Sequence, residues 1–116
     1  MTPDTFRCLA LELPEVVEGA HMGKPDFRVG GRIFATLGRP NEEWGMVALK
    51  PHEQDLLVGA EPVMYRPVPG GWGKRGCTYV NLAEVDEVSL RSALLMAWRS
   101  KAAKRLAARH AALADA

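Results

Sequence analysis

Residues that could exchange a proton or hold an anion lie close together in one segment, at His21, Lys24 and Asp26. Histidine exchanges a proton near neutral pH more readily than any other side chain. A lysine and a carboxylate beside it would place an acid, a cation and a base around a small ligand. We therefore interpret these residues as a candidate ligand cleft. The alternative is structural: the histidine caps a loop, and Asp26 forms an ion pair with Lys24 or Arg28 at little gain in stability.

A second group of residues is suited to contact nucleic acid. Trp72 stands between glycines and is followed by Lys74 and Arg75, which joins a stacking surface to charges that attract phosphate. The alternative is that Trp72 folds back as a lid over a sheet and that the two cations only keep the turn soluble.

Cations also flank a second turn. Arg28 and Arg32 lie on either side of the glycine pair at positions 30 and 31 and give this turn a cationic tip. Further cations follow near the C-terminal end of the chain. We expect any DNA contact to involve Arg28, Arg32, Trp72, Lys74, Arg75, Lys101, Lys104 and Arg105.

Motifs of established enzyme classes are missing from the sequence. It has no nucleophile elbow, no zinc-ligand spacing and no dinucleotide fingerprint. His52 and His110 stand alone and are expected to face solvent, and Cys8 and Cys77 are expected to be reduced thiols. We therefore expect no catalytic residue, no cofactor and no metal, and a role other than an enzyme's is favoured.

Local patterns predict the elements that position these residues. Thr2 is a good N-cap, with Pro3 at the first helical position. Gly23 and Pro25 indicate a constrained polar loop that leads into a hairpin, because one permits positive φ and the other fixes φ. Apolar alternation on both sides of the glycine pair predicts a two-residue hairpin turn within residues 27–37.

The remaining elements complete an α+β pattern. We expect a short strand at 16–17, a strand over 44–50, a helix over 51–60, an edge strand over 63–68, a glycine-rich loop over 69–76, a strand over 78–82 and a long helix after Asp86. This order predicts an antiparallel sheet packed by helices on one side. The expected core residues are Phe27, Phe34, Val47, Leu49, Val80, Leu82, Leu94 and Trp98.

The last helix combines two incompatible faces. Four apolar residues fall within one arc of the helix: Leu90, Leu94, Ala97 and Trp98. Four cations fall largely on the continuation of the same arc: Lys101, Lys104, Arg105 and Arg109. Because burial of unpaired charges is costly, we predict that this helix breaks or leaves the core between Ser100 and Lys104.

Length and composition indicate one ordinary domain. The 116 residues are 47% hydrophobic and 25% charged, as in soluble globular proteins. No signal peptide is apparent, and no apolar run approaches the ~20 residues of a membrane helix, so we expect a cytoplasmic protein without membrane contact. We assign residues 1–116 to a single domain in which residues 101–116 form a basic helical extension.

Charge is unevenly distributed along the chain. Residues 89–116 carry six Lys or Arg and one Asp, whereas residues 1–88 carry nine Lys or Arg and 13 Asp or Glu. A basic segment favours nucleic acid, but the acidic body repels phosphate. Charge therefore supports only weak or local DNA binding.

Three segments resemble the MmcQ/YjbR family of small bacterial proteins. They run from His21 to Leu37, from Gly71 to Leu82 and from Leu94 through Trp98 to Leu106. The family is labelled DNA-binding, and its architecture is compared with the frataxin-like fold and with double-wing modules. The resemblance implies a YjbR-like domain, with wings at residues 28–32 and 72–75.

Three functions remain open from the sequence. The first is weak, largely non-specific DNA binding through hairpin wings. The second is a small-ligand-binding or enzymatic module whose cleft, at His21, Lys24 and Asp26, holds an anionic metabolite. The third is an adaptor that binds a protein partner through its aromatic and basic C-terminal segment. The oligomeric state is left open.

Overall fold

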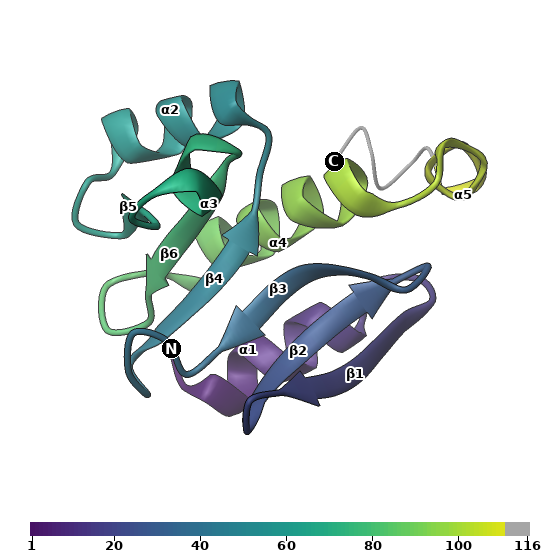
Figure 1. Cartoon of the computed structure of the whole chain (residues 1–116), viewed down its shortest axis with the longest axis horizontal. Coiled ribbons are helices and arrows are strands. Elements are labelled where there is room, and N and C mark those ends of the chain that lie inside the picture. The colour runs from purple at the N-terminus through teal and green to yellow at the C-terminus, as the bar shows by residue number, and fades with distance from the viewer. Residues whose placement is uncertain (111–116) are drawn as a thin grey trace.

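The computed structural model describes residues 1–110 as an antiparallel sheet of six strands with helices packed on it (Figure 1). The strands are β1 (Val16–His21), β2 (Lys24–Val29), β3 (Arg32–Leu37), β4 (Trp44–Ala48), β5 (Tyr65–Pro67) and β6 (Cys77–Asn81). The helices are α1 (Pro3–Leu11), α2 (Pro51–Ala60), α3 (Gly71–Lys74), α4 (Glu87–Lys101) and α5 (Lys104–Arg109). The strand order is β1-β2-β3-β4-β6-β5. The predicted α+β class is confirmed.

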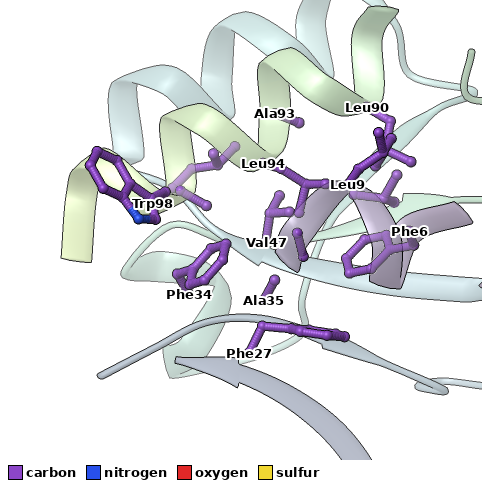
Figure 2. Close-up of a cluster of buried hydrophobic side chains, with 14 of the residues drawn as sticks. Phe6, Leu9, Phe27, Phe34, Ala35, Val47, Leu90, Ala93, Leu94 and Trp98 are labelled. Atoms are coloured by element: carbon purple, nitrogen blue, oxygen red, sulfur yellow. The ribbon is translucent and has the colours of Figure 1, made fainter. Parts of the chain in front are cut away.

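Helices α1 and α4 pack against one face of the sheet, and the core lies between them and the strands (Figure 2). All eight residues predicted to be buried are buried. The packing is close: a Cβ at Gly45 of β4 would lie 2.7 Å from Cε2 of Phe6. Glycine at this position therefore lets α1 bring its phenylalanine onto the sheet.

Helix starts form where the sequence predicts them, and so does the hairpin turn at Gly30 and Gly31 between β2 and β3. The Thr2 side chain accepts a hydrogen bond from the backbone N–H of Thr5, and Asp86 accepts one from Ser89. The loop after His21 is shorter than predicted, because only Met22 and Gly23 separate β1 from β2. Both residues have positive φ, at 51° and 76°, as a two-residue hairpin turn requires. His21 is therefore the last residue of a strand rather than a loop cap.

The predicted break in the last helix is confirmed. Helix α4 ends at Lys101 and α5 starts at Lys104. Trp98, just before the break, is buried and its indole N–H donates to the Pro14 carbonyl at 3.0 Å. In the short α5, Leu106 packs onto the core. Residues 111–116 of the predicted basic extension lie outside the described residues.

The prediction of a glycine-rich loop over 69–76 is wrong, because the segment contains the helical turn α3. Gly70 enters it with φ of 77°, and its carbonyl accepts from the N–H of Lys74 at 3.2 Å. Gly73 packs so closely that an added Cβ would lie 1.7 Å from the Val68 carbonyl oxygen. Strand β5, which contains Pro67, lies at the sheet edge as predicted.

Candidate ligand-binding site

On the face of the sheet opposite α1 and α4, one residue from each strand forms a continuous row. The strand pairings align Gly19, Asp26, Thr36, Met46, Tyr79 and Arg66 across the whole sheet. Their strand neighbours, such as Phe27, Val47 and Val80, point into the core. Because side chains alternate between the two faces of a strand, this row belongs to the open face.

A cavity of about 260 Å³ lies on the open face, and we call it the cup. Its apolar lining comes from Ile33, Met46, Ala48 and Val68. Trp72 of α3 and Tyr79 of β6 add two aromatic rings. Trp72 is 65% exposed, so one side of the cup is an accessible aromatic surface.

The cup forms where strands β3 and β4 separate. These strands pair over only three positions, Ala35–Leu37 with 45–47, so the start of β3 has no pairing with the end of β4. The last turn of α4 lies at this opening: the Ser100 hydroxyl donates to the Ala48 carbonyl at 2.7 Å. The next residue, Lys101, lines the cup.

The ionisable groups around the cup give it a basic character. His21, Arg39 and Lys101 line it, together with Thr36, Cys77 and Tyr79, and no Asp or Glu of residues 1–110 belongs to the lining. Burial raises the pKa of the Cys77 thiol, which keeps the thiol protonated and weakly nucleophilic at neutral pH. The cup therefore favours an anion over a cation.

Asp26 lies beside the cup in a buried ionic cluster. The carboxylate is fully buried. It accepts from Arg28 twice, from Nε at 2.8 Å and from Nη2 at 3.0 Å, and its Oδ2 lies 2.9 Å from His21 Nδ1. The hydrogen bonds from Arg28 hold the pKa of Asp26 below its usual value, with a smaller contribution from His21, while burial opposes this shift.

A glycine makes room for the cluster. Gly19 lies opposite Asp26 in the β1–β2 register. A Cβ at Gly19 would lie 2.9 Å from Asp26 Oδ1 and 3.4 Å from Arg28 Nε. The bare backbone of β1 therefore lets the carboxylate and the guanidinium lie close against the strand.

Of the three residues predicted to form the cleft, the structure brings two together. His21 and Asp26 are in contact, but Lys24 Nζ donates to Glu42 Oε1 at 2.7 Å. The partner of Asp26 is thus Arg28, one of the two candidates in the structural interpretation.

Several lining residues were missed by sequence reasoning. Arg39 and Met46 line the cup although no motif contains them, and Tyr79 lines it as well, although the segment from Gly71 to Leu82 was not expected to contact the cleft through this residue. Tyr79 is also held in place by its surroundings: the Arg66 guanidinium lies 4.5 Å from the Trp44 ring centre and 5.6 Å from that of Tyr79. The signal that could have found Met46 is the alternation of β4, because every second residue of a strand with one covered face must point to the open one.

The residues predicted to contact DNA are distributed over several places. Arg28 is bound to Asp26, whereas Trp72 and Lys101 line the cup. Lys74 and Arg75 lie at the end of α3, with the Arg75 guanidinium 5.5 Å from the Trp72 ring centre.

The remaining three residues that were predicted to contact DNA are Arg32 at the start of β3 and Lys104 and Arg105 on α5. The β2–β3 turn lies near α5, because Gly30 and Arg105 line the same small depression. These three cations therefore belong to the end of the molecule that α5 forms (Figure 1).

Metal and membrane sites find no support in residues 1–110. No three His, Cys, Asp or Glu side chains gather there as a metal ion would require. None of the helices in this part of the chain combines the length and the apolar character needed to cross a membrane.

Comparison with known proteins identifies the family. The YjbR family model matches residues 11–100, and the chain therefore belongs to the YjbR family. A crystal structure of Deinococcus radiodurans protein DR2400, with the family-model domain DUF419, has the same fold. It superimposes with a TM-score of 0.73 at 21% identity, over 93% of this chain and 86% of that one. No curated protein matches the sequence.

Proposed function

We propose that this protein binds a small organic anion with a flat, apolar body in the cup. The observation that carries the proposal is the lining: an apolar floor and two aromatic rings, bordered by His21, Arg39 and Lys101, with no acidic side chain from the described part of the chain. Arginine binds carboxylates with two parallel hydrogen bonds, and an aromatic ring stacks on tryptophan or tyrosine. The cup is smaller than the ~300 Å³ at which drug-sized pockets begin, so a single-ring acid is the expected size.

Three related probes separate the contributions of charge and ring. Benzoate carries both, benzamide lacks the charge, and cyclohexanecarboxylate lacks the aromatic ring. Isothermal titration should show the tightest binding for benzoate, because only benzoate satisfies both the cations and the aromatic surface. Equal affinity for benzoate and benzamide, or no binding of either, would contradict the proposal.

Charge-removing variants locate the site. Arg39→Met and Lys101→Met should each weaken benzoate binding by about ten- to hundredfold, which corresponds to the loss of one charge-assisted hydrogen bond. Lys74→Met is the matched control, since Lys74 is an exposed cation outside the lining of the cup. It should leave the affinity unchanged.

A second candidate function is weak DNA binding at the two ends of the molecule. Its support is the grouping of Arg32, Lys104 and Arg105 around the β2–β3 turn and α5, with Lys74 and Arg75 on α3 as a second cationic site. Since few phosphates are within reach of so few cations, affinity should be about 10⁻⁴ to 10⁻⁶ M at physiological salt, with ~3 to 5 charges in the salt slope.

Fluorescence anisotropy with a labelled duplex at two salt concentrations tests this candidate. Charge reversal of Lys74 and Arg75 together should weaken binding, and His21→Ala should leave it nearly unchanged. The absence of binding even at low salt would eliminate DNA as a partner.

A further inference from the structure

The contact between His21 and Asp26 determines which ring nitrogen of the histidine is protonated. Asp26 is fully buried and its two hydrogen bonds from Arg28 keep it ionised. An ionised carboxylate only accepts hydrogen bonds, so Nδ1 of His21, at 2.9 Å, must carry a proton. In the neutral ring, Nε2 is then the atom with a lone pair, ready to take a second proton.

Nε2 is accessible from the cup. The His21 side chain is 42% exposed and lines the cavity. Among residues 1–110, the ring has one hydrogen-bond partner, which is Asp26 through Nδ1. A proton can therefore reach Nε2 from solvent or from a molecule in the cup.

Charged groups lie on several sides of His21. Asp26 favours a positive imidazole, but Arg28 already neutralises this carboxylate. Lys24, the register partner of His21 on β2, is bound to Glu42. The other groups that share the lining are Arg39, Lys101 of α4 and the uncharged Cys77 and Tyr79 of β6.

An anion in the cup would lie on the exposed side of the His21 ring, where its negative charge favours the protonated imidazole. We propose that binding of the anion is coupled to the uptake of one proton by Nε2 of His21, with Asp26 as the residue that positions the ring. One proton moves from solvent to the imidazole, and no other bond changes. The inference rests on the proposed function, since it requires that the cup binds an anion.

Calorimetry in buffers of different ionisation enthalpy measures the proton directly. Benzoate is a suitable probe because a carboxylate stays ionised at about pH 6 and at about pH 8, so any proton must bind to the protein. The observed enthalpy should change with the ionisation enthalpy of the buffer, with a slope of up to one proton between these two pH values. Between the two pH values, benzoate affinity should decrease by up to about tenfold per pH unit.

His21→Asn separates proton uptake from structure. Asparagine can still donate to Asp26 but cannot take a proton near neutral pH. The variant should lose the buffer dependence and bind benzoate more weakly than the wild type at about pH 6, with similar affinity at about pH 8. His52→Asn is the matched control, because His52 is an exposed histidine of α2, and it should behave as the wild type.

Asp26→Asn tests the positioning role. Because the Nδ1 proton then lacks its anionic acceptor, proton uptake should fall while benzoate still binds. The number of protons taken up on benzoate binding would not change if Asp26 only stabilised the fold. Thermal unfolding checks that the variant is folded.

The outcomes distinguish the two proposals. Wild-type binding that is independent of pH and buffer would overturn proton uptake and leave the proposed function intact. Proton uptake that persists in His21→Asn would also overturn the inference. A wild type that binds no benzoate at either pH would overturn both.

Discussion

Asp26 combines three features at the scale of a single residue: complete burial, two hydrogen bonds from Arg28 and one contact with His21. A buried carboxylate without such partners would be protonated or would destabilise the fold. Here the partners keep it charged. The cluster therefore orients His21 and at the same time anchors the open face of the sheet.

Asp26 should make stability depend on pH. Its pKa in the folded protein is below the ordinary value of 3.8, so the unfolded chain binds a proton more tightly than the folded one. The contribution of Asp26 is thus present above pH 3.8 and is lost as pH falls through the lower folded value. Asp26→Asn should cost about 1–3 kcal/mol at neutral pH.

Urea unfolding at about pH 7 and about pH 3 checks this prediction. The difference in unfolding free energy between wild type and Asp26→Asn should shrink at the lower pH. If this difference in unfolding free energy stayed constant or increased at the lower pH, the ionised carboxylate of Asp26 would not be the form that stabilises the fold.

Gly19 should be difficult to replace. A Cβ there would lie 2.9 Å from Asp26 Oδ1, so Gly19→Ala must displace a carboxylate held by Arg28. We expect a loss of about 1–3 kcal/mol in unfolding free energy. Gly59→Ala is the control, because the added Cβ has no atom within 4 Å and alanine favours a helix. Equal stability of the two variants would contradict the tight packing at the cluster.

Sequence patterns reveal part of this residue-scale arrangement. Charge type and spacing are enough to single out His21 and Asp26, since both belong to one short segment. The choice of Arg28 over Lys24 as ion-pair partner depends on the strand register, which brings Gly19 opposite Asp26. Arg39 reaches the cup from the loop between β3 and β4, and Tyr79 reaches it from β6, so local sequence could not associate them with it.

Most of the elements follow from local patterns, and the exceptions have physical causes. The break between α4 and α5 is predictable because one helical face cannot be both apolar and cationic. Helix α3 is not predictable from local sequence, because its glycines disfavour a helix in isolation. Its turn is stabilised by tertiary contact instead: Gln54 Nε2 donates to the Gly73 carbonyl at 3.0 Å. The separation of β3 from β4, which opens the cup, likewise has no local signal.

Helix α3 should control the cup through Gly73. A Cβ at Gly73 would lie 1.7 Å from the Val68 carbonyl oxygen, so Gly73→Ala must move the helix and with it Trp72. We expect a loss of stability of about 2 kcal/mol or more, and benzoate binding should be abolished or strongly weakened.

Gly71→Ala provides the comparison within the same helix. Its added Cβ has no atom within 4 Å, so both stability and benzoate affinity should stay near the wild-type values. Thermal unfolding and isothermal titration on the two variants check the prediction. If Gly73→Ala and Gly71→Ala had similar stability and similar benzoate affinity, α3 would not shape the cup.

At the scale of the whole molecule, the charge asymmetry of the sequence is partly compensated in the fold. Arg91 of α4 pairs with Glu12 at 2.8 Å and with Glu87 at 3.3 Å, and Arg109 of α5 lies 3.9 Å from Glu15. The acidic body thus neutralises part of the basic C-terminal segment. Counting charges along the chain overestimates the cationic surface, because Glu12 and Glu15 pair with arginines that are distant in sequence.

The most direct measurement of the central claim is a map of where the anion binds. Two-dimensional ¹H–¹⁵N NMR of the labelled protein, titrated with benzoate, reports every backbone amide. The largest shifts should occur along the floor and rim of the cup, at His21, Thr36, Met46 and Tyr79, and benzamide should cause much smaller ones. Shifts confined to α5 and the β2–β3 turn, or the same response to benzamide as to benzoate, would contradict an anion site on the open face of the sheet.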